Sequence, residues 1–418
     1  MASKNLGRSG RAMVCAWALM LGQPALAADA GQPGNGLTIA LDQAWRLHPQ
    51  AAALADRAAA AQATQELAGG LMPEPGSVSI GSRNDRANRN LGQQEYEVEL
   101  AAPLWLPGQK AAREAAAASL VDEVVAQRAA LRWELAGDLR EAWWQLAAAR
   151  NARALTARRL DTARALANDV RRRHAAGDLS RIDANLAQSE VLAADAELIE
   201  AEAALLQAEQ ALQMLTGAPL PTLIDEEAPA SQASAGALRT APEVHPQLAA
   251  AAALARSSRA RVQVAAESPR AAPELALRVV RERGDFAEPY SSSVGVRLKI
   301  PFSAGAQVRR ENAVAQADAS QAEAEMMRAR SRVQLAAERA QRALLAAEQQ
   351  FAMARERRAL AADTLRLAEK AFTLGESDLA TLLRIRAAAF DAEAFYDRQR
   401  VARAAAISRL NQALGALP

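Results

Sequence analysis

Residues 95–100 read Glu-Tyr-Glu-Val-Glu-Leu, and this strict alternation of charged and apolar side chains decides the fold class. Successive side chains of an extended strand point to opposite faces. One face of this strand therefore carries Tyr96, Val98 and Leu100, and the other carries Glu95, Glu97 and Glu99. The pattern returns further along the chain, where one face would carry Val294, Val296, Leu298 and Ile300, and the other Ser293, Gly295, Arg297 and Lys299. Each stretch follows a weaker partner strand, near 77–82 and 274–281, so the sequence predicts two β-hairpins.

The two hairpins belong to a long internal repeat. His48-Pro49-Gln50 recurs as His245-Pro246-Gln247, and the strand-closing Pro103 recurs as Pro301, in each case roughly 198 residues later. Gly177 and Gly375, which interrupt long helical patterns, keep the same spacing, as do the helix-ending Gly217 and Gly415. We therefore predict a first structural repeat over 29–217 and a second over 242–418, joined by a linker over 218–241 that is rich in Pro, Ala and Ser.

Each repeat is expected to contain a helix, two strands and a very long helical hairpin. The strands fall at about 77–106 and 274–302, and the helical hairpins at 108–217 and 305–418. Proline, which breaks helices, is absent between Pro107 and Pro219 and again between Pro301 and Pro418. Large apolar residues recur at three- and four-residue steps, as in Leu135, Leu139 and Trp143, which is typical of packed coiled coils. The predicted fold is mainly α with a small β part, although a spectrin-like rod would fit the helices equally well.

Composition supports long, closely packed helices. Apolar residues make up 50% of the chain and aromatic residues only 4%, and Ala alone accounts for roughly a quarter, well above ordinary usage. Ala has the highest helix propensity and lets helix backbones approach closely. The net charge of +2 lacks the strong basic excess of a nucleic-acid-binding protein.

The first 28 residues are predicted to be a secretory signal peptide. Lys4, Arg8 and Arg11 precede a short apolar run from Ala12 to Leu21, and small residues at 25–28 suit a cleavage site. The single Cys15 would leave with this segment, so the exported chain would contain no cysteine. No later segment approaches the ~18 uninterrupted apolar residues of a membrane-spanning helix.

The hairpins distinguish a membrane protein from a soluble rod. A strand with one apolar and one charged face suits a membrane β-barrel with a wet interior, although a hairpin packed on a helix shows the same alternation. Each hairpin here runs directly into a long helix, so no domain covers its apolar face. Four strands cannot close a barrel, which needs at least ~eight, and open strand edges are not tolerated in lipid. We therefore expect several copies of the chain to share one barrel, with the apolar faces named above toward membrane lipid and Glu95, Glu97, Glu99, Arg297 and Lys299 toward the lumen.

Several segments, taken in order, resemble the TolC-like outer-membrane efflux proteins, particularly the branch associated with heavy-metal resistance. They are the helix opener ALDQAWRLHPQAAALADR, the junctions LAAPLWLPGQKAAREAAAAS and LKIPFSAGAQVRRENAVAQA, and the turns HAAGDLSRIDANLAQ and FTLGESDLATLLRIR. The resemblance implies a homotrimer with a twelve-stranded outer-membrane barrel and a periplasmic α-helical tunnel. It also implies docking of the tunnel tip to a periplasmic adaptor (membrane fusion protein), which would work with an inner-membrane pump of the RND type.

The two helical turns carry most of the implied function. By resemblance, the adaptor would dock on Gly177, Leu179, Ser180, Gly375, Ser377 and Leu379. Physically, the glycines permit a left-handed turn between helices, and Ser180 and Ser377 are placed to cap the returning helices. The basic run of residues 171–174 is explained by favourable charge at a helix C-terminus.

The periplasmic gate is expected to differ from the pattern of the family's best-known member. Asp183 matches an acidic gate position, whereas the related second-repeat positions hold Thr381 and Arg384, and Ser377 stands where an arginine is expected. The ionic latch would then be absent or rewired through Arg181 or Asp378, so cation selectivity does not carry over from the family.

Two other functional classes fit the sequence less well than the channel does. A periplasmic coiled-coil adaptor or scaffold usually has one helical hairpin between β-rich domains, whereas this chain has two hairpins and few strands. An enzyme is the weakest reading, because the sequence has no phosphate loop, nucleophile elbow or metal-ligand spacing. His48 and His245 precede prolines at helix openings and are interpreted as turn residues, so we expect no metal site and no cofactor.

Overall fold

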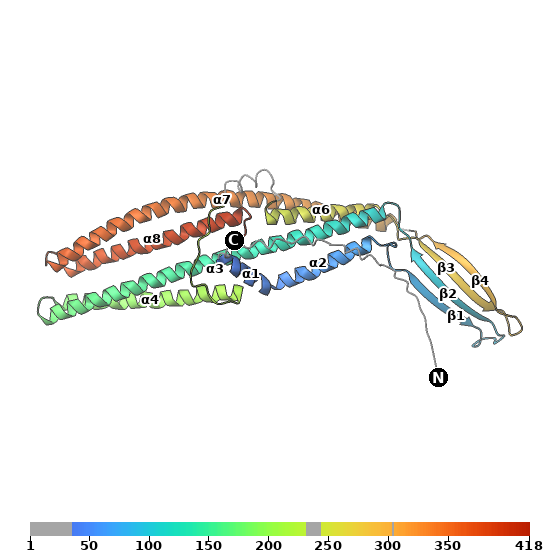
Figure 1. The fold of residues 1–418 in the computed structure, drawn as a ribbon, viewed down its shortest axis with the longest axis horizontal. Coiled ribbons are helices and arrows are strands. Elements are labelled where there is room, and N and C mark those ends of the chain that lie inside the picture. Colours follow the sequence, from blue (N-terminus) through green and yellow to red (C-terminus); the bar gives the residue numbers. More distant parts are fainter. Residues whose placement is uncertain (1–35, 231–243, 303–304) are drawn as a thin grey trace, which may run out of the picture. The chain divides into compact units, whose positions relative to one another are not determined.

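A computed structural model describes residues 36–230, 244–302 and 305–418. The predicted signal peptide (1–28) and the second half of the predicted linker therefore lie outside the described residues. The first repeat contains α1 (Gly36–Leu47), α2 (Pro49–Ala68), β1 (Ser77–Asn84), β2 (Gln94–Pro103), α3 (Gln109–Ala175) and α4 (Arg181–Thr216). The second contains α6 (Pro246–Ala266), β3 (Glu274–Arg283), β4 (Ser291–Lys299), α7 (Gly305–Thr373) and α8 (Leu379–Ala413) (Figure 1). Among the described residues, each element of the first repeat apart from α1 has a counterpart in the second.

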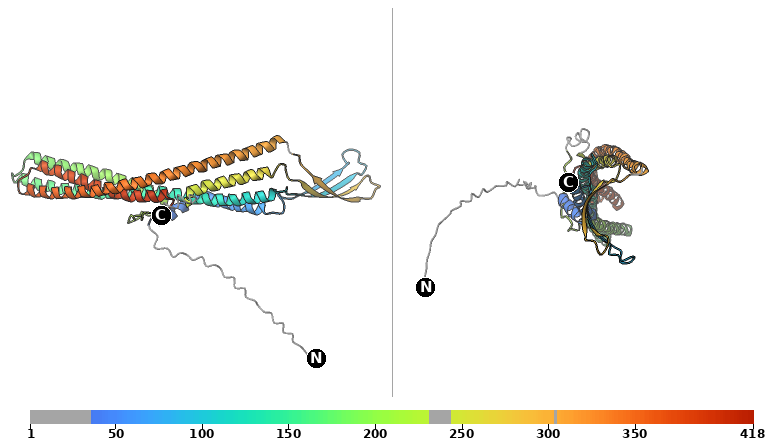
Figure 2. Two further views of the ribbon diagram at one scale, coloured as in Figure 1. Left: turned by 90° about the horizontal axis from the view of Figure 1, so that it is seen from above. Right: turned by 90° about the vertical axis from the view of Figure 1, so that its right-hand side faces the viewer.

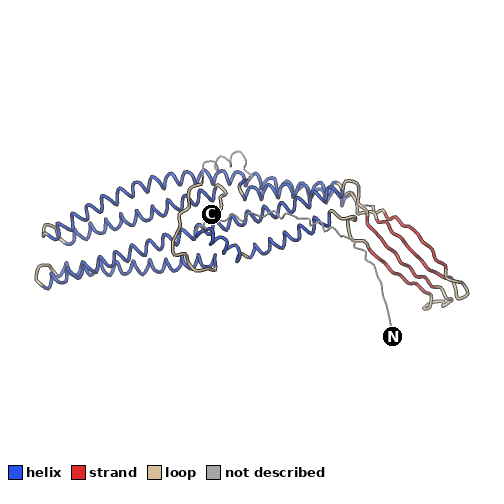
Figure 3. The backbone as a smooth tube through the Cα atoms, in the orientation of Figure 1, coloured by secondary structure: helices blue, strands red, loops and turns tan. Residues whose placement is uncertain are grey.

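The four strands form one antiparallel sheet in the order β1-β2-β3-β4, and they group together apart from the helices (Figure 3). Pairing between the repeats runs through β2 and β3, with Val98 opposite Val279 and Leu100 opposite Leu277. The two predicted hairpins are therefore neighbours in a single sheet. Ile300, expected in the last strand, follows the end of β4.

The helices form a layer in which the helices of the first repeat lie beside those of the second, as the strands do in the sheet. α3 contacts both α2 and α6, and α6 contacts α7; further along, α4 packs on α3, α3 contacts α8, and α8 packs on α7. Figure 2 shows α7 and α8 running side by side as the second hairpin. At about 1.5 Å per residue, the 67 residues of α3 and the 69 of α7 give helices of roughly 100 Å. Alanine makes this close packing possible, and Ala194, Ala354 and Ala392 are fully buried.

The two larger apolar clusters of the described residues help to hold the helices together. The larger one joins α1, α3, α4 and α8 through residues that include Leu41, Leu139, Trp143 and Leu212. A smaller one lies near the helical turns and takes side chains from all four hairpin helices, among them Val170, Ala187, Phe372 and Leu382. The stripe predicted from Leu135, Leu139 and Trp143 is buried in the larger cluster.

One detail of the helix opener differs from expectation. We predict one helix before the strands of each repeat, whereas the first repeat has two, α1 and α2, which are separated at the turn residue His48. His48 has an extended backbone (φ −71°, ψ 120°) and Pro49 begins α2. The residue before a proline is sterically pushed out of the helical region, which explains the break.

Candidate channel-forming sheet and helical tips

One face of the sheet consists of apolar rows that run across all four strands. The register aligns Val78, Leu100, Leu277 and Val296 in one row and Ile80, Val98, Val279 and Val294 in the next. Every one of these side chains is exposed, and Ile80 reaches 81%. Soluble proteins seldom expose a continuous apolar surface of this kind unless something else covers it. The predicted lipid-face residues Tyr96 and Leu298 also lie on this face.

The opposite face carries a network of ion pairs. Arg278 on β3 contacts Glu97 at 2.6 Å and Glu95 at 3.4 Å, and Arg297 on β4 pairs with Glu99. Lys299 lies 3.3 Å from Glu274. The residues predicted to line a lumen therefore share one face, and each charge has a partner. Arg278 is the central cation of this network and was not singled out from the sequence.

The first helical tip is closed by a capping box. Gly177 adopts a left-handed backbone (φ 90°), which allows the chain to leave α3 and turn back. Ser180 is the N-cap of α4: its hydroxyl accepts from the Asp183 backbone N–H at 3.2 Å, and the Ser180 backbone N–H donates to the Asp183 carboxylate at 3.0 Å. The predicted cap at Ser180 is thus confirmed. Asp183, a gate candidate, uses its carboxylate in this cap.

The second helical tip is capped by a different residue from the one expected. The predicted cap at Ser377 is wrong, because α8 begins one residue later and its N-cap is Asp378. The Asp378 carboxylate accepts from the Thr381 backbone N–H at 2.7 Å. This hydrogen bonding to Thr381, with the nearby charge of Arg384, lowers the pKa of Asp378. Gly375 (φ 78°) makes the same left-handed turn as Gly177.

The predicted docking residues are not equally accessible. Leu379 is only 1% exposed and Leu179 is half-buried, and both pack in the apolar cluster near the turns. Their side chains therefore hold the tip together. Ile182 and Leu374 were not among the predicted docking residues, and both are exposed at the two tips.

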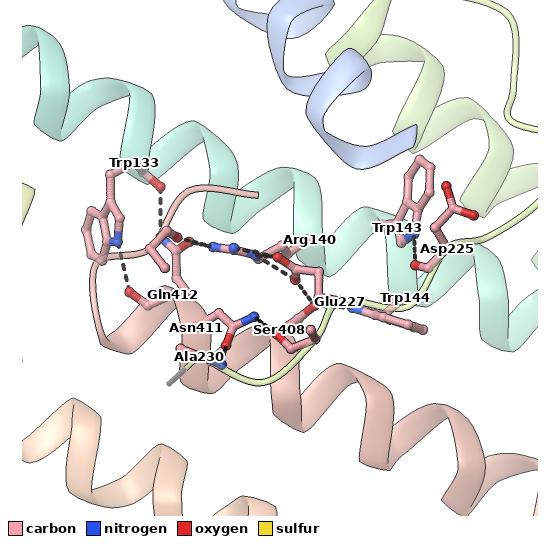
Figure 4. A network of polar contacts seen from close by, with 12 residues as sticks. Trp133, Arg140, Trp143, Trp144, Asp225, Glu227, Ala230, Ser408, Asn411 and Gln412 are labelled. Atoms are coloured by element: carbon pink, nitrogen blue, oxygen red, sulfur yellow. Dashed lines mark hydrogen bonds and ion pairs between the residues drawn. The ribbon is translucent and has the colours of Figure 1, made fainter. Parts of the chain in front are cut away.

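A buried polar network ties the start of the linker to both repeats (Figure 4). Arg140 of α3 and Glu227 are 2% and 6% exposed, and the guanidinium Nη2 lies 2.7 Å from the carboxylate Oε1. Arg140 also donates to the Ala416 carbonyl at 3.0 Å, and Glu227 accepts from Ser408. The sequence signal for this network was an arginine inside the apolar stripe of α3, directly after Leu139.

The two repeat-related histidines are helix N-caps, as predicted for turn residues. His48 precedes α2 and His245 precedes α6, each with extended backbone. His245 packs edge-on against Trp133 at 4.8 Å between ring centroids, and burial lowers its pKa to about 4. Within the described residues, no group of three or more His, Cys, Asp or Glu side chains is arranged to hold a metal ion.

Comparison with known proteins gives this sheet and helix layer a precedent. A family model described as outer membrane efflux protein matches residues 41–218, which span most of the first repeat. Over this part of its sequence the chain is similar to that family. Among curated proteins, no sequence matches the chain significantly.

Solved structures extend the match to both repeats. The outer membrane protein VceC of Vibrio cholerae shares 15% identity at a TM-score of 0.73, over 91% of this chain and 96% of that one. The CmeC outer membrane channel of Campylobacter jejuni shares 15% identity at a TM-score of 0.72, over 91% of this chain and 85% of that one. The MtrE outer membrane channel of Neisseria gonorrhoeae, in its open state, shares 18% identity at a TM-score of 0.72, over 91% of this chain and 89% of that one. The fold is therefore that of these channels.

None of the helices in the described ranges contains a stretch long and apolar enough to cross a membrane.

Proposed function

We propose that this chain is the outer-membrane channel of a tripartite efflux pump, a passive duct that performs no chemistry itself. The observation that carries the proposal is the four-stranded sheet, with exposed apolar rows on one face and paired charges on the other. This arrangement places lipid-compatible side chains outside and water-compatible side chains inside a barrel wall.

The sheet has two open edges, whereas a barrel that spans a membrane can have none. β1 pairs only with β2 and β4 only with β3 among the described strands. The proposed solution is a homotrimer in which β4 of one subunit pairs with β1 of the next, so that four strands per subunit give a twelve-stranded barrel. The helix layer has the matching open sides, α2 and α4 on one and α7 on the other.

Exposed apolar stripes on those open helices support the same assembly. Leu192, Ile199 and Leu206 of α4 are exposed at seven-residue spacing. On α7 the exposed side chains at this spacing are Met353, Leu360 and Leu367. Seven-residue spacing is the signature of a coiled-coil seam. We infer that α4 of one subunit packs on α7 of its neighbour.

The assembly is tested by comparing Ile199→Arg with Gln207→Arg on the same helix. The first places a charge in the apolar stripe, and the second places the same charge on an exposed polar position. We expect Ile199→Arg to abolish the heat-modifiable trimer in outer-membrane fractions and Gln207→Arg to preserve it. Planar-bilayer recording of purified trimers tests the duct. A mature protein that stays soluble and monomeric would refute the channel and favour a periplasmic scaffold.

The helical tips are the proposed docking site for a periplasmic adaptor. The exposed surface there combines Gly177, Ser180 and Gly375 with the apolar Ile182 and Leu374. Ile182→Asp with Leu374→Asp should abolish adaptor cross-linking while the trimer persists. Retained cross-linking would place docking elsewhere.

The cargo class and the pump are proposed from the sequence's resemblance to the heavy-metal-resistance branch. On this basis an RND-type pump delivers heavy-metal cations to the duct. Deletion of the gene should raise sensitivity to divalent transition metals and leave sensitivity to organic drugs unchanged. The reverse pattern would reassign the cargo to drugs.

The gate is proposed to lack the carboxylate latch. Asp183 and Asp378 each use one carboxylate oxygen to cap a helix, which ties both groups to their own turns. Arg181 and Arg384 then remain as basic groups near the turns. Substitution of Arg384 by Gln should change the ion preference of single channels, and an unchanged preference would remove it from the constriction.

A further inference from the structure

Two arginines lie on the apolar face of the sheet, just beyond the last apolar row toward the loops. Arg281 is opposite Tyr96 and Arg283 is opposite Gln94 in the β2–β3 register. Both residues follow Val279 on β3 at two-residue steps, so their side chains share the face of the apolar rows. The loop end of this face is therefore basic.

No acidic side chain neutralises these guanidinium groups. Glu282 lies between them in sequence and therefore points to the opposite face, as does Glu95. In the adjoining loop, the Asp285 and Glu288 carboxylates accept backbone N–H groups at 2.6 Å and 3.0 Å. Within residues 36–230, 244–302 and 305–418, no ion pair forms to Arg281 or Arg283.

An aromatic ring holds the two cations close together. The guanidinium carbons of Arg281 and Arg283 each lie 4.9 Å from the centre of the Tyr290 ring. Tyr290 also faces Tyr96 at 6.5 Å. Tyrosine rings at the margin of an apolar band are typical of the membrane–water interface. Two like charges against one ring repel each other, and an anion between them would relieve this repulsion.

We propose that Arg281 and Arg283 form a clamp for the phosphate groups of the phosphorylated glycolipid in the outer leaflet of the outer membrane. This inference rests on the proposed barrel, in which the loops opposite the helices face the cell exterior. A phosphomonoester carries close to two negative charges, and the planar guanidinium forms paired hydrogen bonds with phosphate oxygens. The clamp would fix the depth of the barrel and bind lipid tightly enough to stabilise the trimer.

The test uses trimers reconstituted in phosphatidylcholine nanodiscs with or without diphosphorylated lipid A. The readout is the temperature at which the trimer dissociates, together with the number of lipid A molecules retained in native mass spectrometry. Lipid A should raise this temperature for the natural protein, and the R281Q/R283Q variant should lose the increase and bind lipid A roughly tenfold or more weakly.

Arg83 offers a matched control in the same sheet. It lies near the same loops but on the charged face, where it pairs with Glu95 at 3.7 Å. R83Q should therefore keep the full effect of lipid A. An equal effect of lipid A on R281Q/R283Q, or an equal effect of dephosphorylated lipid on the natural protein, would overturn the clamp. Such a result in conducting trimers would leave the channel intact, whereas failure to insert would reject the proposed function itself.

Discussion

Replacement of Glu227 by alanine should release the linker from the helix layer. The substitution leaves Arg140, 2% exposed, buried without its carboxylate partner. The lost contacts include Nη2–Oε1 at 2.7 Å and Nε–Oε2 at 3.0 Å, and Ser408 also loses its acceptor. Removing one member of a buried ion pair typically destabilises a protein by about 3–5 kcal/mol, because the remaining charge is neither solvated nor paired.

Hydrogen exchange measured by mass spectrometry is the suitable assay. The described part of the linker, residues 218–230, lies against α3 and α8 through this network. Where opening is fast and reversible, exchange reports the free energy of local opening. A loss of about 3–5 kcal/mol corresponds to exchange that is faster by roughly two to four orders of magnitude in this segment. Replacing both partners with apolar residues (R140M/E227L) should recover much of the protection, since no unpaired charge then remains.

The chain contains a matched control for this experiment. Glu141 and Arg409 come from the same two helices and form two contacts of 2.7 Å, but they are 46% and 57% exposed. Because solvent screens this pair, Glu141→Ala should cost no more than about 1 kcal/mol. The reasoning fails if Glu227→Ala and Glu141→Ala have equal effects, or if R140M/E227L is as unstable as the sum of its single variants.

Three further predictions concern the helix caps and turns. Ser180→Ala should destabilise α4 by about 1 kcal/mol in thermal unfolding followed by circular dichroism, whereas Ser377→Ala should change stability by less than about 0.5 kcal/mol; equal losses would contradict the cap assignment. Gly177→Ala should cost about 1–2 kcal/mol from backbone strain alone, because its φ is 90° and no atom lies within 4 Å of an added Cβ; unchanged protease resistance at this turn would count against it. Burial lowers the pKa of His245 from 6.5 to about 4. Between these pH values the unfolded chain binds a proton that the folded chain does not. The free energy of unfolding should therefore fall by about 2 kcal/mol as the pH drops through this window, after allowance for solvent screening. The His245→Gln variant should lose this dependence, and an unchanged pH profile would remove His245 as its source.

The order of helices and strands could be predicted from the sequence, because the residues that determine it act locally. Pro103 ends β2 and Pro301 follows shortly after β4, while Gly177 and Gly375 turn the helices; each signal acts through its own backbone conformation. Because the structural unit is duplicated, each of these signals occurs twice in the chain. The alternation of Glu95 to Leu100 likewise fixed which side chains share a face, since that depends only on strand periodicity.

Residue roles that depend on neighbours were harder to predict. Ser377 and Asp378 are both good capping residues, and only the start of α8 decides between them. Leu379 looked like a docking residue but is buried, because the apolar cluster near the turns recruits side chains from four helices. Arg140 lies inside an apolar stripe, but only the tertiary structure shows that its partner is Glu227, 87 residues away.

The sequence by itself determined the two repeats, their helices and hairpins, and the two chemically different faces of each strand. These features follow from periodicity and from proline and glycine, which act over a few residues. Only the tertiary structure decided that the hairpins join through β2 and β3 into one sheet, that Glu227 reaches Arg140, and that Arg281 and Arg283 share one unneutralised surface. These outcomes depend on which distant segments meet, and that is decided by packing across the whole chain.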